Sequence, residues 1–205
     1  ALKAIGIDSS RLDVVLMQLV NLMKDGEPVR MSKRTGNAVT LVDLLDEVPI
    51  DAARFFFNMR EPGSTIDFDL GLAVKEDSQN PVYYCQYANA RICSILRKMK
   101  EEGIEPRDCT EEELMLLNAP EERELIRHLS ALTDEIITAA KDYDPARITR
   151  YAVTLATLFH KFYNACRVGV DDEKLRAARL YLCCRVKDVM GIILTEFKIT
   201  VPESM

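Results

Sequence analysis

From about residue 80 onward, apolar residues recur every three or four positions, which is the spacing of amphipathic helices. Capping and turn residues divide this pattern, namely Asn80-Pro81, Gly103, Pro120, Asp144-Pro145 and Asp171-Asp172. The pattern predicts long helices at residues 81–102, 120–142, 145–167 and 173–197, with a short helix at 111–118. Helices of this length joined by short connections predict a helical bundle.

The first part of the chain has a different pattern. Leu12–Met23 is almost continuously apolar and rich in Val and Leu, which predicts a buried strand. Residues 24–27 fit a tight turn, after which residues 28–31 could pair back. A strand this apolar needs cover on both faces, as in a parallel α/β sheet. Because the chain does not obviously supply that cover, we expect the neighbours of this strand to lie upstream of Ala1.

Short helices are expected between these two parts. Thr40 and Asp43 have the spacing of a capping box and predict a helix start. The apolar face of that helix would consist of Leu41, Leu44, Leu45 and Val48. A second short helix is expected from Ile50, and residues 67–70 are expected to lead into a third helix that runs to about residue 78. The boundary between the two parts therefore lies near residues 63–80.

Length and composition indicate an ordered, soluble protein. The chain has 205 residues, of which 48% are hydrophobic and 29% are charged. No run of about 18 apolar residues is present, so we expect no membrane span and no membrane partner. The chain starts without a signal-peptide pattern or an initiator Met, which we interpret as a cut or processed end inside a larger protein.

Cysteine and histidine usage indicates a reduced, cytoplasmic protein. The six cysteines form no CxxC pair and only two histidines are present, so we expect no metal site. Most of the cysteines stand among apolar residues at helical spacing, where they behave as small hydrophobic side chains.

The net charge of −6 argues against a non-specific nucleic-acid coat protein. It leaves room for a local basic face. Such clusters occur at residues 91–100, at Lys161 with Arg167, and at Arg176 with Arg179. Taken singly, each cluster is more simply interpreted as a solvated helix face.

The segment Val29–Asn37 has the composition of an anion-binding loop. Arginine and lysine supply charge, serine and threonine supply hydroxyl donors, and Gly36 lets the backbone approach a ligand. Composition alone favours a solvated turn. The ordered string Arg30-Met31-Ser32-Lys33-Arg34 changes this interpretation, because it resembles the KMSKS loop of class I aminoacyl-tRNA synthetases.

The predicted helix that starts at Pro81 carries tyrosines, amides and an arginine within about three turns. Tyr84, Tyr87 and Arg91 recur at spacings of three and four, so they share one face. Tyrosines stack on bases and arginine binds phosphate or stacks, which makes this face a candidate RNA contact. Packing of the tyrosine rings into the bundle core is an equally good explanation.

A second aromatic segment spans residues 158–168. Phe159 and Tyr163 share one face of the predicted helix there, and His160 shares another with Asn164. We expect His160 to be a packed or surface polar residue rather than a catalytic base. The reason is that no Ser or Cys nucleophile with an Asp partner accompanies it.

Four strings along the chain resemble bacterial-type arginyl-tRNA synthetases, in the same order. They are DAARFFF at residues 51–57, IDFDL at 66–70, NPVYYCQYANAR at 80–91 and LFHKFYNACRV at 158–168. The resemblance covers essentially the whole chain. It departs at Arg30 and Arg34, which replace a Lys and a Ser of the loop, and at Asn89, where the family often has His. We therefore assign no base contact to position 89.

The resemblance implies a mainly α fold with two parts. Residues 1–75 would be the tail end of a Rossmann-type α/β catalytic domain, including the KMSKS-like loop and a region that contacts the tRNA stem. Residues 76–205 would be a helical-bundle, DALR-type anticodon-binding domain, of the kind shared with cysteinyl-tRNA synthetase.

The resemblance also implies an arginine–tRNA ligase, which activates arginine with ATP and transfers it to arginine tRNA. ATP would be a substrate, Mg²⁺ is expected, and no tightly bound cofactor is implied. Lys33 is the implied catalytic residue, and Arg30 and Ser32 would help it to bind phosphate. The implied anticodon-binding residues are Tyr84, Tyr87, Arg91, Phe159, Tyr163 and Met205.

The same resemblance sets expectations for the isolated piece. The HIGH motif and the arginine pocket would lie upstream, so we expect these 205 residues alone not to aminoacylate. We expect a monomer. Two other classes of function stay open: a non-catalytic tRNA-binding module, and a helical scaffold whose aromatic faces bind a protein. A preference for the arginine anticodon would separate these from each other.

Overall fold

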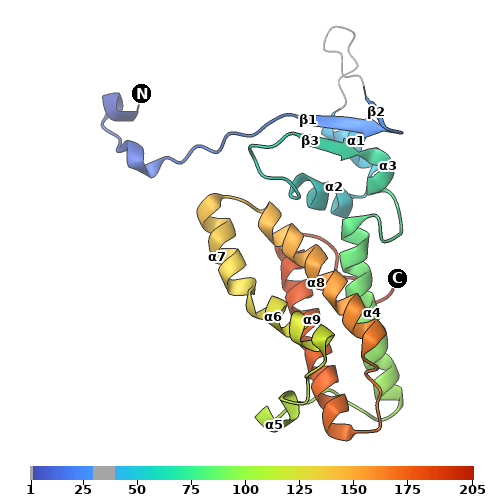
Figure 1. The fold of residues 1–205 in the computed structure, drawn as a ribbon. Coiled ribbons are helices and arrows are strands. Elements are labelled where there is room, and N and C mark those ends of the chain that lie inside the picture. Colours follow the sequence, from blue (N-terminus) through green and yellow to red (C-terminus); the bar gives the residue numbers. More distant parts are fainter. Residues whose placement is uncertain (1, 30–39) are drawn as a thin grey trace.

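The computed structural model describes residues 2–29 and 40–205. A small sheet with short helices forms one end of the molecule and a helical bundle forms the other, which confirms the mainly α prediction (Figure 1). The predicted phosphate-binding residues Arg30, Ser32 and Lys33 lie outside the described residues, so their role stays a prediction. In the part that is described, no helix combines the length and apolar character needed to cross a membrane.

The described residues contain a three-stranded sheet in the order β2-β1-β3. Its strands are β1 (Val20–Lys24), β2 (Glu27–Pro28) and β3 (Ile66–Asp69). β1 turns back into β2 through Asp25 and Gly26, whose positive φ angles of 54° and 81° suit a tight hairpin. β1 pairs with β3 in parallel, with Leu22 opposite Phe68.

Two helices cover this sheet. They are α1 (Leu41–Glu47) and α2 (Ile50–Phe57). The predicted capping box is confirmed, because the Asp43 carboxylate accepts from the Thr40 amide at 2.7 Å and the Asp43 amide donates to the Thr40 hydroxyl at 3.2 Å. Phe68 of β3 packs against the rings of Phe56 and Phe57, with centroids 5.4 and 5.2 Å away. These rings form the core of the layer.

The predicted apolar face of α1 is only half right. Leu44 and Val48 are buried, whereas Leu41 is 64% exposed and Leu45 is 38% exposed. The helix is short, so only one edge of it meets the sheet and α2.

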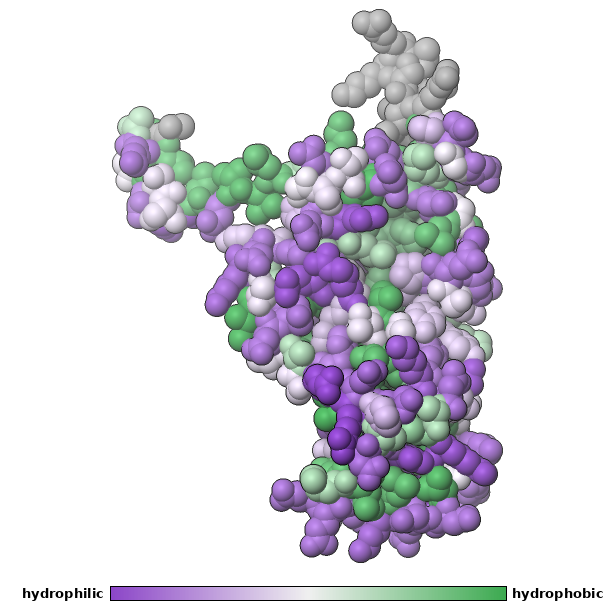
Figure 2. All heavy atoms as spheres, in the orientation of Figure 1, coloured by the Kyte–Doolittle hydropathy of each residue, from purple (hydrophilic) through white to green (hydrophobic). Residues whose placement is uncertain are grey.

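The prediction of a buried strand over Leu12–Met23 is wrong in its first part. Two 3-10 turns, Leu2–Ile5 and Ser9–Arg11, are followed by an extended segment at residues 12–19 that pairs with no strand of the described chain. Its apolar side chains are exposed, and Figure 2 shows them as a continuous hydrophobic stretch leading away from the sheet. An apolar sequence favours a strand but does not supply the partner that a strand needs.

The third short helix is present but is shorter than predicted, because it ends at Ala73 rather than near residue 78. Ile66–Asp69 forms β3, and the helix that follows, α3 (Leu70–Ala73), is a single turn capped by Asp69. Ile66 and Phe68 are buried while Asp67 is exposed, which is the alternation of a strand. The sequence IDFD already carries this period of two.

Among the described residues, the bundle contains three of the predicted long helices and, in place of the fourth, two shorter ones. They are α4 (Pro81–Glu101), α6 (Pro120–Ser130), α7 (Leu132–Asp142), α8 (Ala146–Ala165) and α9 (Glu173–Glu196). Asn80 and Asp172 cap α4 and α9 with their side chains, and Gly103 ends the first of these with a φ of 76°. Fully buried core side chains include Leu155, Phe159, Phe162, Leu180 and Met190.

The single helix predicted over residues 120–142 is two helices that change direction at Ala131. The reason is a tertiary contact with α8. The His128 carbonyl accepts a hydrogen bond from the Tyr151 hydroxyl at 2.9 Å and another from the Ala131 amide at 3.1 Å. The side-chain rings of His128 and Tyr151 also stack, with centroids 4.0 Å apart. The His128 carbonyl thus accepts hydrogen bonds that are not part of the regular pattern of an α-helix, in which it would accept from the amide four residues later.

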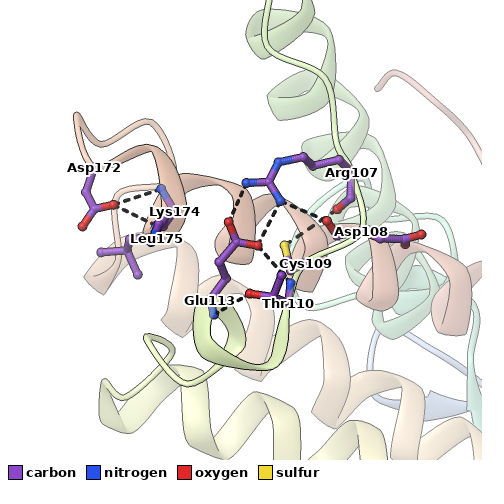
Figure 3. Close-up of polar contacts among 8 residues, drawn as sticks. All are labelled: Arg107, Asp108, Cys109, Thr110, Glu113, Asp172, Lys174 and Leu175. Atoms are coloured by element: carbon purple, nitrogen blue, oxygen red, sulfur yellow. Dashed lines mark hydrogen bonds and ion pairs between the residues drawn. The ribbon is translucent and has the colours of Figure 1, made fainter.

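The loop between α4 and α5 (Glu111–Leu114) is fastened by an ion pair, shown in Figure 3. Glu113 accepts from two nitrogens of Arg107, at 2.6 and 2.9 Å, and from the Thr110 amide at 2.9 Å. The Arg107 guanidinium and the Thr110 amide together lower the pKa of Glu113 to about 2.

A second ion pair is buried between α6 and α9. Arg179 donates to Glu122 at 2.7 Å, and the two side chains are only 12% and 1% exposed. Arg179 also donates to the Arg167 carbonyl at 2.7 Å. The Arg176–Arg179 cluster of the sequence is therefore partly structural. All six cysteines are free, and burial raises the pKa of the Cys85 and Cys183 thiols.

Candidate functional site

An open pocket of about 550 Å³ lies between α4 and α8, together with the loop before α4. Its walls are mainly aromatic and include Tyr83, Tyr84, Tyr87, Arg91, His160 and Tyr163. The structure thus brings four of the predicted RNA-binding residues into one pocket. Three come from one face of α4, as the helical spacing predicted, and Tyr163 comes from α8.

The rings of this pocket form a layered wall. Tyr83 and Tyr87 are nearly parallel, with centroids 6.4 Å apart and an angle of 6° between the rings. The His160 ring lies next to two of the pocket tyrosines, with its centroid 4.9 Å from that of Tyr84 and 5.6 Å from that of Tyr87. Flat aromatic surfaces of this kind suit the stacking of a planar ligand.

Arg91 supplies the positive charge of the pocket. Its Cζ atom is 5.1 Å from the centroid of Tyr87 and 4.9 Å from that of Tyr163, and its guanidinium donates to the Tyr87 hydroxyl. Hydrogen bonds to Tyr87 and Tyr163 raise the pKa of Arg91. A permanently charged, planar group therefore lies between two rings, where it can bind phosphate or stack.

Phe159, another predicted anticodon contact, does not line the pocket. Its side chain is fully buried and packs against His160, Phe162 and Tyr163, with ring centroids 5.5 to 6.4 Å away. Phe159 and Tyr163 are one helical turn apart, and the sequence cannot show which of them faces the core. Phe159 supports the pocket wall from behind.

His160 is a pocket residue that sequence reasoning did not place in the site. Burial, and then the nearby charge of Arg91, lower its pKa. Its Nε2 atom is buried without a hydrogen-bond partner among the described residues. The alignment of His160 with Asn164 on one face, next to Tyr163, was the signal that could have identified it.

Met205, the last predicted anticodon contact, is not part of the pocket. It is 52% exposed, and the chain end is held instead on α4, where the Asn89 amide donates to the Pro202 carbonyl at 2.7 Å. Asn89 itself is fully buried, so its side chain serves this contact rather than a ligand. The role predicted for Met205 stays a prediction.

Residues 85–205 match the family model described as the DALR anticodon binding domain. The chain belongs to this DALR family. The matched region contains most of α4 and all of α8 and α9, and therefore Tyr87, Arg91, His160 and Tyr163 of the pocket. These four pocket residues thus fall inside the matched DALR domain, and Tyr83 and Tyr84 lie just before its start.

The whole chain is also similar to curated proteins and solved structures. It is 53% identical to the arginine–tRNA ligase of Caldanaerobacter subterraneus subsp. tengcongensis, over 100% of this chain and 36% of that protein. The corresponding ligase of Acetivibrio thermocellus is 51% identical, with the same coverage. The chain spans about a third of the length of these relatives.

The structural neighbours agree with this similarity. A protein described as an arginyl-tRNA synthetase from Campylobacter jejuni superposes with a TM-score of 0.82 at 30% identity, over 100% of this chain and 43% of that one. The Thermus thermophilus arginyl-tRNA synthetase gives 0.72 at 25% identity, over 90% of this chain and 34% of that one.

Proposed function

We propose that this chain binds the anticodon of arginine tRNA in its aromatic pocket, as part of an arginine–tRNA ligase. The observation that carries the proposal is the position of the pocket. Tyr84, Tyr87, Arg91 and Tyr163 converge within or beside the DALR domain of a chain that is similar over its whole length to arginine–tRNA ligases.

The pocket chemistry supports an unpaired base as ligand. Single-stranded loops expose bases that stack on aromatic side chains, and each such contact contributes about 1–3 kcal/mol. The Arg91 guanidinium can then neutralise an adjacent phosphate. Because the chain carries a net charge of −6, the attraction to RNA is local, and binding should weaken as salt screens it.

The same proposal gives residues 76–205 the task of recognising the anticodon and residues 1–75 the task of assisting the chemistry. Lys33, with Arg30 and Ser32, would bind the phosphates of ATP, together with Mg²⁺, while arginine is activated. This half of the proposal rests on the KMSKS-like string and on the similarity to named ligases. Cations near the α-phosphate and the leaving pyrophosphate stabilise the charge that develops there.

Two tyrosines that lie equally far from an arginine provide a sharp test of the pocket. Arg91 lies 4.9 Å from the Tyr163 centroid, and Arg185 lies 4.9 Å from the Tyr181 centroid on a different face of the bundle. We expect Tyr163→Ala to weaken filter binding of an arginine anticodon stem-loop by about ten- to a hundredfold. Tyr181→Ala, which loses the same kind of contact elsewhere, should bind normally. Equal losses in both variants would refute the pocket assignment.

The phosphate half has a separate test. In the protein that carries this chain together with any residues preceding Ala1, Lys33→Ala should abolish most of the arginine-dependent ATP–pyrophosphate exchange. Its affinity for arginine tRNA should not change, because the anticodon pocket is intact. Normal exchange in this variant would remove Lys33 from the mechanism.

A further inference from the structure

The end of the chain folds back onto the rest of the molecule through specific backbone bonds. α9 ends at Glu196, and Lys198 adopts a left-handed conformation with a φ of 57°. The Ile199 amide then donates to the Leu194 carbonyl at 2.9 Å, and the Ile199 side chain is only 4% exposed. The tail at residues 198–202 is thus anchored in the core and directed toward α2 and α4.

A polar cluster joins this tail to α2 and α4. The Asp51 carboxylate of α2 accepts from the Gln86 side chain of α4 at 3.0 Å and from the Thr200 amide at 3.1 Å. Gln86 also donates to the Thr200 carbonyl at 3.0 Å. One turn along α2, Arg54 donates to the Lys198 carbonyl. Asp51 is therefore the group that contacts both the tail and α4.

α4 carries this cluster and the aromatic pocket on different faces. Gln86 and Asn89 hold the tail, and Asn89 donates to the Pro202 carbonyl at 2.7 Å. Tyr84 and Tyr87 line the pocket. Because one helical turn takes 3.6 residues, Gln86 lies more than a quarter turn away from each of these two tyrosines. A displacement of α4 at the pocket face must also displace its tail face.

We infer that Asp51 is a positioning residue that couples occupancy of the aromatic pocket to the α1–α2 layer through its hydrogen bonds with Gln86 and with the C-terminal tail. This inference rests on the proposed function, because it takes an RNA base as the occupant of the pocket. A close-packed interior transmits small shifts rather than absorbing them. A base that fixes α4 against α8 also fixes Gln86, and through Asp51 it fixes the start of α2.

The coupling would act on the layer formed by α1, α2 and the three-stranded sheet. α2 packs against α4 on one side and against β3 on the other, where Phe56 and Phe57 contact Phe68. Tightening the contact at Asp51 should therefore make local opening of residues 41–57 rarer. Hydrogen exchange of the backbone amides measures such opening directly.

The test compares three proteins with and without a saturating arginine anticodon stem-loop. In the wild-type chain, RNA should slow amide exchange in residues 41–57 by about fivefold or more, the lower end of typical coupling between sites. Asp51→Ala removes the acceptor and should abolish this slowing. Asp51→Asn keeps an oxygen that can accept from Gln86 and Thr200, and should retain it. Stem-loop affinity should change by less than about threefold in both variants, because the open form is a minor population.

The possible outcomes distinguish a failure of the proposed RNA binding from a failure of the coupling alone. If the wild-type chain binds no RNA, the proposed function fails and the coupling fails with it. If the wild type binds RNA but exchange in residues 41–57 is unchanged, the coupling alone is wrong. Slowing that persists in Asp51→Ala would overturn the assignment to Asp51. Loss of slowing in Asp51→Ala with retention in Asp51→Asn would support it.

Discussion

The guanidinium of Arg91 lies over the ring of Tyr163, with 4.9 Å between Cζ and the ring centroid. This contact joins α4 to α8 across the pocket, so the candidate site exists only when the two helices are packed together. The same guanidinium lies 5.1 Å from Tyr87 on its own helix. Arg91 therefore supplies positive charge to the pocket and also packs against two of its aromatic rings.

Two substitutions of Arg91 test separately how its charge and its planar shape contribute to RNA binding. Arg91→Lys keeps the charge but loses the planar group, so stem-loop binding should weaken by about three- to tenfold, and Arg91→Ala should weaken it more. Arg185→Lys is the matched control, since Arg185 has the same contact with Tyr181 outside the pocket. Filter binding at one fixed salt concentration measures the effect. If Arg91→Lys bound like the wild type, the planar contact would not matter.

The half-buried His160 predicts a dependence of stability on pH. Burial and Arg91 lower its pKa below the usual value of 6.5, so the unfolded chain binds this proton more readily than the folded one. The folded state should therefore lose stability as the pH falls from about 7 through 6.5 and below. His160→Gln should reduce the loss between pH 7 and pH 5, as measured by urea denaturation. An unchanged pH dependence in this variant would exclude His160 as the source.

Glu113 predicts a second dependence at lower pH. Its pKa is lowered from 4.5 to about 2 by Arg107 and by the Thr110 amide, so its contribution is complete above about 4.5 and is lost as the pH falls toward 2. Glu113→Gln should flatten the stability profile in this window. The neighbouring exposed Glu112 provides a control, because Glu112→Gln removes a carboxylate without touching the pair with Arg107. Equal profiles for the two variants would contradict the account.

The Arg179–Glu122 pair should be the most sensitive polar contact of the bundle. Both side chains are largely buried, so Arg179→Met leaves the Glu122 carboxylate with the Ala119 amide but without a charged partner, and should lower the free energy of unfolding by about 3–5 kcal/mol. Urea denaturation measures this change. The double variant Glu122→Leu with Arg179→Met removes both charges and should recover part of the loss. A double variant less stable than Arg179→Met would show that the buried charge is not the cause.

The helix starts could be predicted because the signals that set them are local. Asn80 and Asp172 cap their helices with their own side chains, and Thr40 and Asp43 of the capping box are only three positions apart. The direction change at Ala131 could not be predicted in this way. It depends on the Tyr151 hydroxyl, which reaches the His128 carbonyl from another helix.

The site shows the same division between local and tertiary information. Helical spacing placed Tyr84, Tyr87 and Arg91 on one face, and the structure confirms that they line one pocket. Spacing could not distinguish Phe159 from Tyr163, because the packing of α8 decides which ring is buried. The prediction of a buried strand at residues 12–19 is wrong for a related reason, since a strand requires a partner that its own sequence does not contain.

The central claim is that the aromatic pocket recognises the anticodon of arginine tRNA. The most direct measurement is filter binding of this chain to arginine tRNA and to the same tRNA with its anticodon bases replaced. The account predicts that the replaced tRNA binds at least about tenfold more weakly, since losing one recognised base costs about 1–3 kcal/mol. Equal affinity for the two RNAs would contradict it and would favour the interpretation of the bundle as a protein-binding scaffold.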